Sequence, residues 1–164
     1  MWPTPLPTAP GQESVWDYPR PPRVEPSDEV VEVVLGGEVV ARTTASLRVL
    51  ETSHPPTYYL PADAFSDGVL RPTPGHTYCE WKGRASYFDL VTPTRTTARA
   101  AWTYPDPIAG FEALVGHVAV MPGLVHECRV DGEVVRPQEG GFYGGWITDR
   151  VVGPFKGGPD TRGW

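Results

Sequence analysis

Proline and glycine are spread through the whole chain, and this spacing excludes long helices. The 164 residues include 20 Pro and 18 Gly, and no stretch between them is long enough for a substantial amphipathic helix. Runs of β-branched residues fill the gaps instead. We therefore expect a mainly β protein with one or two short helices. A chain of this length suits a single domain that buries roughly 70% of its unfolded surface.

Two segments have the residue pattern of a β-hairpin. In residues 29–43, Gly36 and Gly37 separate two Val-rich runs, and a glycine pair suits the two-residue turn of a hairpin. In residues 127–135 an Asp-Gly pair does the same. Other expected elements are strands at 46–51, 57–60, 77–90, 99–104 and 117–121, a Gly/Pro loop at 67–75, and short helices at 61–65 and 108–115.

The two ends of the chain are irregular but carry aromatic residues. Residues 1–11 are Pro-rich, and we expect a flexible lead-in. Trp16 and Tyr18 follow among further prolines, which indicates an arm laid across the domain. Residues 138–164 read as a glycine-jointed strap that its aromatic side chains pin in place. The β domain is therefore predicted to span residues 12–164, strap included.

Charge and hydropathy exclude two classes of partner. The formal net charge is −6, and the 14 Lys and Arg are scattered, so no basic cluster indicates a nucleic-acid partner. No apolar run approaches the length of a membrane span, and the first residues lack the features of a signal peptide. We therefore expect a soluble, cytoplasmic protein. Its two cysteines, Cys79 and Cys128, are expected to be reduced and buried.

Residues 77–90 combine charge with aromatic side chains. In a strand, Glu80, Lys82 and Arg84 would share one face opposite apolar or small residues. If that face lines a hollow, Glu80 is a candidate general base and Lys82 an anchor for an anionic or carbonyl group. The alternative is an outer sheet face on which all three charges are solvated.

A polar pocket with aromatic walls is the strongest site that the sequence predicts. Arg48 and Glu51 lie three positions apart, so both reach it only at a bulge or a strand end. The residues expected to bind the ligand are Arg48, Glu51, Tyr58, Tyr59, Trp81, Tyr87, Trp102 and Tyr104.

A zinc site is a weaker alternative. Its four soft ligands would come in two pairs, His76 with Cys79 and His126 with Cys128. The spacings match no standard zinc pattern, so buried thiols and surface imidazoles are expected instead. His54, which precedes two prolines, is expected to be structural. The sequence has no nucleophile elbow and no phosphate-binding glycine loop, and it identifies no cofactor.

Six stretches form long and specific motifs. They are VLETSHPP (49–56), YYLP (58–61), CEWKGRASY (79–87), AWTYP (101–105), GGFYGGWIT (140–148) and GPFKGGP (153–159). Together they resemble the longer form of the bacterial family of uncharacterised domains numbered four hundred and twenty-seven, sometimes labelled a nucleotidyltransferase domain. The likeness runs from about residue 13 to residue 164.

The resemblance implies a single domain of bent antiparallel sheets, a tent-like or partly open barrel fold related in outline to small zinc-binding β folds. It implies no settled activity, and paired metal-binding carboxylates beside a Gly-Ser turn, which the label would require, are absent from the sequence. The sequence departs from the family pattern at residues 92–98 and at Met121. The family motif would bring together Glu51, Tyr59, Glu80, Trp81, Lys82, Trp102 and Tyr104.

These observations predict a small-molecule-binding β domain in which Glu80 and Lys82 contact the ligand. Any catalysis would use Glu80 as acid or base and Lys82 as electrostatic stabiliser. The alternative is a non-enzymatic interaction or scaffold protein that forms a homodimer through its aromatic strap. The sequence identifies neither the ligand nor a reaction.

Overall fold

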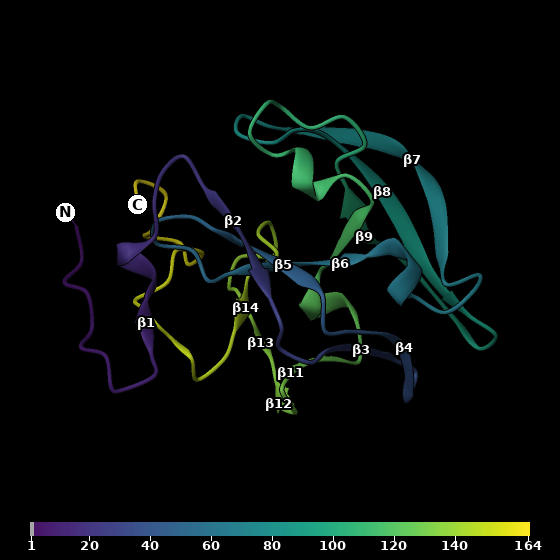
Figure 1. The fold of residues 1–164 in the computed structure, drawn as a ribbon, viewed down its shortest axis with the longest axis horizontal. Coiled ribbons are helices and arrows are strands. Elements are labelled where there is room, and N and C mark those ends of the chain that lie inside the picture. The colour runs from purple at the N-terminus through teal and green to yellow at the C-terminus, as the bar shows by residue number, and fades with distance from the viewer. Residues whose placement is uncertain (1) are drawn as a thin grey trace.

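A seven-stranded antiparallel sheet forms the centre of the computed structural model, which describes residues 2–164 (Figure 1). Around it lie several smaller sheets, none closed into a barrel, so the predicted mainly β single domain is confirmed. Figure 1 shows β7–β9 at one end of the molecule and both termini at the other. In spatial order the strands are β2 (Arg23–Ser27), β5 (Ser46–Leu50), β6 (Thr57–Pro61), β10 (His117–Val120), β9 (Arg95–Thr103), β8 (Gly83–Thr92) and β7 (Leu70–Cys79).

Both predicted hairpins are confirmed, and they form a four-stranded sheet. Gly36 and Gly37 have φ of 61° and 81°, and Asp131 and Gly132 have φ of 48° and 81°. Positive φ at both central residues is the geometry of the two-residue turn that matches strand twist. The strands of this sheet, in spatial order, are β12 (Glu133–Val134), β11 (Glu127–Val130), β3 (Val31–Leu35) and β4 (Glu38–Thr43).

The remaining elements are short. β1 (Glu13–Ser14) pairs in parallel with β15 (Val151–Val152), and β13 (Arg136–Pro137) pairs with β14 (Trp146–Ile147). Every helix among residues 2–164 is a three-residue 3₁₀ turn, too short to cross a membrane. These turns are η1 (Val15–Asp17), η2 (Ala62–Ala64), η3 (Glu112–Leu114) and η4 (Pro122–Leu124). The helix expected at 61–65 is η2, and the one expected at 108–115 shortens to η3.

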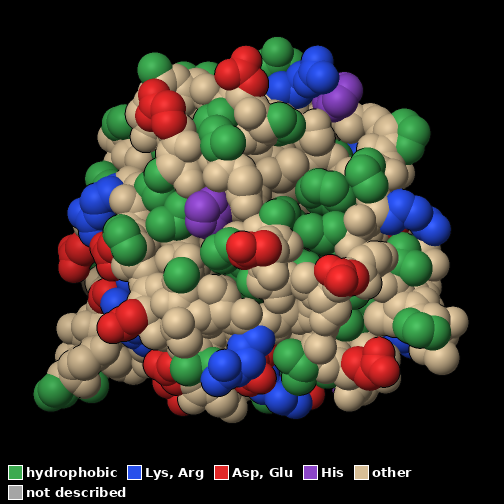
Figure 2. Space-filling view, turned by 45° about the vertical axis from the view of Figure 1, so that its right-hand side comes forward, with side chains coloured by type: hydrophobic (Ala, Val, Ile, Leu, Met, Phe, Trp, Pro, Cys, Tyr) green, Lys and Arg blue, Asp and Glu red, His purple; other side chains and the backbone are tan. Residues whose placement is uncertain are grey.

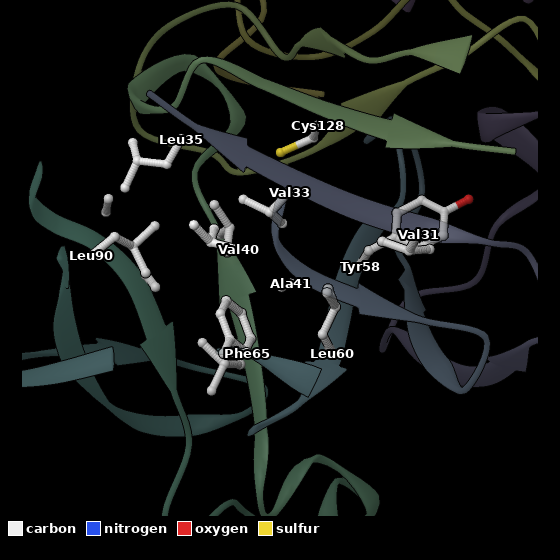
Figure 3. Packing of buried hydrophobic residues seen from close by; sticks show 14 of the residues in the cluster. Val31, Val33, Leu35, Val40, Ala41, Tyr58, Leu60, Phe65, Leu90 and Cys128 are labelled. Atoms are coloured by element: carbon white, nitrogen blue, oxygen red, sulfur yellow. The ribbon is translucent and has the colours of Figure 1, made fainter. Parts of the chain in front are cut away.

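The main core lies between the two larger sheets (Figure 3). Val31, Val33 and Leu35 of β3 are buried and meet Tyr58 and Leu60 of β6. Each large apolar side chain buried in this way stabilises the fold by about 1.5–3 kcal/mol. Cys128 lies in the same core, whereas Cys79 is only partly buried, and both cysteines are free.

The loop predicted at residues 67–75 is wrong, because most of it belongs to β7. This strand contains Pro72 and Pro74, which lack the N–H that a central strand needs. It nevertheless fits, since β7 is an edge strand that pairs only with β8 and its register shifts between Thr73 and His76. The residues at 92–98, where the sequence departs from the family pattern, form the turn and flanking ends of the β8–β9 hairpin.

The N-terminal arm and the C-terminal strap meet at one end of the main sheet. Val15 and Tyr18 are buried there against Leu50 and Val151, so the expected packing of the arm is confirmed. Nearer the start of the chain, the N–H of Leu6 donates to the carbonyl of Gly153 at 3.0 Å. Residue 1 of the predicted lead-in lies outside the described residues.

A buried ionic network holds these ends together. Arg48, whose side chain is 1% exposed, binds the carboxylates of Glu13 and Glu25. Arg150 binds Glu13 at 3.4 Å and Glu29 at 3.0 Å. The pKa of Glu13 is lower than its ordinary value. Burial alone would raise this pKa, but the hydrogen bonds that the carboxylate accepts from Arg48 and Tyr18 have the larger effect. The network therefore links the first strand, the main sheet and the strap.

Candidate functional site

The predicted pocket residues lie on two opposite faces of the main sheet. Arg48 pairs with Tyr58 across β5 and β6, and both point toward the side that carries the inter-sheet core and the ionic network. The next residue, Tyr59, points to the other side, because successive residues of a strand alternate. The predicted residues on that second side are Tyr59, Trp81, Tyr87, Trp102 and Tyr104.

This second face is an aromatic layer that also holds Lys82. The indole N–H of Trp102 donates to the hydroxyl of Tyr59 at 3.3 Å, and the rings of Tyr59 and Tyr104 have centroids 6.3 Å apart. Burial raises the pKa of both phenols, so they stay protonated. The Lys82 ammonium lies 5.7 Å from the centre of the Tyr104 ring, within the range of a cation–π contact.

Glu80 and Lys82 lie in the turn between β7 and β8 and not within a strand, so strand alternation does not govern them. The residue Glu80 is exposed, and its carboxylate makes no hydrogen bond or ion pair with any residue from 2 to 164. Lys82 is half-buried. The structure thus brings Lys82, but not the Glu80 carboxylate, into contact with the predicted aromatic residues.

The turn that follows β5 places a histidine at the centre of a second group of polar residues. His54 is 12% exposed at its side chain. The Gln138 amide nitrogen donates to Nδ1 of His54 at 3.1 Å and to the carbonyl of Lys156 at 2.7 Å, while its oxygen accepts from the N–H of Gly145. Since that N–H can only donate, the orientation of the amide is fixed. Nδ1 is therefore an acceptor, and the imidazole proton is on Nε2.

The positive charges of three side chains act on this imidazole. Burial lowers the pKa of His54 to about 3, and the charges of Lys156, Arg20 and Lys82 contribute to the shift. The chain has only two lysines, and both belong to this group. Neither has an Asp or Glu side-chain carboxylate within 4.0 Å among residues 2–164. At neutral pH the imidazole is uncharged, and the excess charge around it is positive.

Glu51 is the acidic member of the group. Its carboxylate lies 3.6 Å from Nε2 of His54 and 3.4 Å from Nε of Arg20. Because His54 is neutral, the first contact is a dipolar one and only the second is an ion pair. Arg20 also donates to the carbonyl of Thr52 at 2.9 Å, which fixes it beside the turn.

Residues of the C-terminal strap contact both Arg20 and His54. Lys156 donates to the backbone oxygen of Trp164 at 3.2 Å, and Arg20 reaches the same oxygen at 3.5 Å. The Lys156 ammonium is 5.6 Å from the centre of the Tyr143 ring, which packs edge-on against His54 at 4.8 Å. We call this group the His54 site. Its residues are Arg20, Glu51, His54, Lys82, Gln138, Tyr143 and Lys156.

Glycines allow the strap to approach this closely. A side chain at Gly144 would collide with the Trp102 ring, and one at Gly145 would collide with the amide of Gln138. The strap is also bonded to the turn after β5, through Lys156 N–H to the carbonyl of Ser53 at 2.8 Å. The aromatic layer and the His54 site are therefore neighbours, joined by the strap backbone.

The four residues of the zinc alternative do not come together. Cys128 lies in the inter-sheet core, where burial raises the pKa of its thiol, whereas Cys79 packs on the opposite, aromatic face. His76 and His126 are exposed. Across residues 2–164, no group of three or more His, Cys, Asp or Glu is placed to hold a metal ion.

A hollow of about 630 Å³ lies elsewhere, beside the start of β4 and the β8–β9 turn. It contains none of the predicted site residues, and its charged members are Glu38 and Asp67. Figure 2 shows one face of the molecule, on which acidic and basic side chains are interspersed. That face differs from the clustered basic surface that nucleic-acid binding needs.

Residues 23–135 match the model of a protein family described as "Domain of unknown function (DUF427)" and labelled NTP_transf_9. No curated protein matches the chain. The match includes Glu51, His54 and Lys82 but ends before the strap. Sequence reasoning missed the centre of the site because the partner of His54, Gln138, is 84 positions away, and a His-Pro-Pro turn looks exposed.

Proposed function

Because the chain belongs to the DUF427 family, whose description assigns no activity, we propose a function from the His54 site itself: it binds a small anionic molecule. One observation carries the proposal. Arg20 and both lysines of the chain gather around a neutral imidazole, in a protein whose net charge is −6. A local excess of positive charge in an acidic protein favours an anionic ligand over a cationic one.

The cations have hydrogen-bonding capacity to spare. An ammonium has three N–H donors, and Lys156 uses one on the backbone oxygen of Trp164, while Lys82 uses none among residues 2–164. That backbone oxygen marks a position where two cations converge on one acceptor. A carboxylate or phosphate oxygen bound beside it, by the N–H groups of Lys156 that Trp164 does not use, would receive stronger, charge-assisted hydrogen bonds. Partial burial strengthens the attraction further, because the effective dielectric constant is lower than in water.

We assign His54 a role in ligand binding and not in proton transfer. Its Nδ1 accepts from Gln138, and with a pKa of about 3 the imidazole does not take up a proton near neutral pH. Its Nε2–H is a neutral donor directed toward Glu51. The general-base role of Glu80 stays a prediction.

Self-association through the strap is the competing function, and one side chain favours it. Phe142 is 80% exposed, whereas Trp146 is buried and Tyr143, Phe155 and Trp164 are partly covered. A specific interface buries about 800 Å² on each partner, and a single aromatic side chain supplies at most about 250 Å². Ligand binding therefore has the broader support.

Calorimetric titration with inorganic phosphate at constant ionic strength tests the proposal. We expect Lys156→Met and Lys82→Met each to weaken binding by about tenfold, the loss of one charge-assisted hydrogen bond. Arg84→Met is the matched control, since it removes an exposed cation from the same hairpin as Lys82. Glu80→Gln is expected to bind as the native protein does. No phosphate binding to the native protein, or an equal loss in Arg84→Met, would overturn the proposal.

A further inference from the structure

Three aromatic rings lead from the surface to the His54 site. The exposed ring of Phe142 packs edge-on against Tyr143, with centroids 4.9 Å apart and an interplanar angle of 90°. Tyr143 in turn packs edge-on against His54, at 4.8 Å and 72°. The exposed Phe142 is thus the outer end of a continuous aromatic wall that reaches the cations.

The loop that carries Phe142 is fixed at its base. Gly140 has φ of 104° and passes so close to the carbonyl of Gly157 that a side chain there would collide with it. On the other side, Gly144 lies against the Trp102 ring. The backbone of Gln138 also donates to the carbonyl of Gly145 at 3.0 Å, which closes the loop.

Because the base of the loop is fixed, the ring of Phe142 cannot fold back onto the protein surface. In a loose loop, an exposed ring could fold onto a nearby apolar surface and gain about 25 cal/mol for each Å² buried. Here both ends of the loop are held, and Phe142 stays 80% exposed against Tyr143, the ring that Lys156 contacts. The ring is therefore held where a ligand that packs on Tyr143 can also contact it.

We propose that the ligand of the His54 site is an aromatic acid, in which a planar ring is joined to a carboxylate. This inference rests on the anion-binding function proposed above. The carboxylate binds Lys156 and Arg20, and the ring packs against Phe142 and Tyr143. The distances agree, because the Lys156 ammonium is 5.6 Å from the centre of the Tyr143 ring. This separation allows a ring attached to a carboxylate at that ammonium to reach the 4.5–7 Å at which aromatic pairs attract one another.

The adjoining charge selects this ligand over an uncharged aromatic compound. A purely apolar partner would leave the half-buried Lys156 and Lys82 without a counter-charge and would have to desolvate them. An aromatic acid satisfies the cations and covers Phe142 together.

Calorimetric titration with 1-naphthoate, acetate and 1-naphthylmethanol tests the proposal. In the native protein we expect 1-naphthoate to bind about five- to tenfold more tightly than acetate, the contribution of one or two aromatic pairs. Phe142→Ser should reduce this ratio to below about threefold and leave the affinity for acetate within about twofold. The control Val134→Ser removes a half-exposed apolar side chain from β12 and should change neither affinity. The uncharged 1-naphthylmethanol should bind more weakly than 1-naphthoate.

The outcomes separate this inference from the function on which it rests. Binding of acetate without a preference for 1-naphthoate, or an unchanged preference in Phe142→Ser, overturns the aromatic ligand and leaves anion binding intact. Failure of phosphate and both carboxylates to bind overturns anion binding itself. Sedimentation of the native protein as a dimer that Phe142→Ser dissociates assigns Phe142 to self-association and overturns the inference.

Discussion

The side-chain amide of Gln138 donates a hydrogen bond of 3.1 Å to Nδ1 of His54, and this contact joins the C-terminal strap to the turn after β5. The same amide donates to the carbonyl of Lys156 and accepts a hydrogen bond from the N–H of Gly145. One buried side chain therefore fixes the tautomer of the imidazole, the position of a cation and the path of the strap.

Replacing Gln138 by Met should destabilise the protein by about 2–4 kcal/mol. The substitution keeps the volume but leaves the N–H of Gly145, the carbonyl of Lys156 and Nδ1 of His54 without their partner. Urea unfolding monitored by circular dichroism measures the loss. Gln12→Met is the matched control, because the hydrogen bonds of Gln12 are exposed, and it should cost about 1 kcal/mol or less. Equal losses in both variants would contradict the role assigned to Gln138.

As pH falls below about 6.5, the protein should lose stability because His54 takes up a proton in the unfolded chain but not in the folded protein. The pKa of His54 is about 3 in the folded protein, against an ordinary value of 6.5. Between these values the unfolded chain binds one more proton, so stability falls as pH falls below 6.5, and the loss is complete near pH 3. From pH 7 to pH 5 the native protein should lose about 2 kcal/mol more than His54→Asn. Urea unfolding at the two pH values measures the difference, and parallel losses would show that the imidazole is not held neutral.

Removing the buried guanidinium of the ionic network should cost more than removing an exposed one. Arg48→Met leaves Glu13 and Glu25 without their shared partner, although both carboxylates keep some contact with water. We therefore expect a loss of about 2–3 kcal/mol, toward the lower end for a broken buried pair. Arg23→Met removes an exposed partner of Glu25 and should cost less than about 1 kcal/mol. Thermal and urea unfolding compare the two, and similar losses would argue against a structural network.

Adding one methyl group to the strap should displace it from the aromatic layer. A Cβ at Gly144 would overlap the Trp102 ring, and such overpacking costs about 1–3 kcal/mol. Gly144→Ala should also increase the solvent exposure of tryptophan, seen as a red shift of the fluorescence emission. Gly163→Ala meets no atom within 4 Å and should change stability by less than about 0.5 kcal/mol. An unshifted spectrum in Gly144→Ala would mean that the strap does not rest on Trp102.

The hairpins could be predicted from the sequence because their signals are local. Gly36 and Gly37 need no distant partner to favour a tight turn, and both have the positive φ that such a turn requires. Edge position is not local. The first part of β7, residues 70–75, falls within the predicted Gly/Pro loop, and only the arrangement of the sheet reveals that Pro72 and Pro74 lie at an edge.

The candidate site also has a part that local sequence predicts and a part that it does not. Alternation along β6 already requires that Tyr58 and Tyr59 point to opposite faces, and the structure places them so. Lys82 and the aromatic layer could be predicted from neighbouring motifs. The His54 site could not, because its cations come from residues 20, 82 and 156, and no periodicity in the sequence relates three such positions.

The His54 site has a consequence for how the protein matures. Ribosomes make Glu51 and His54 about a hundred residues before Lys156, and the last strand of the two larger sheets, β12, ends at Val134, so a nascent chain has every strand of both sheets before it has the site. The proposed anion binding therefore requires that the strap has been made and has returned to the turn after β5. A fragment cut before Lys156 would keep the matched family region and lack one cation of the site.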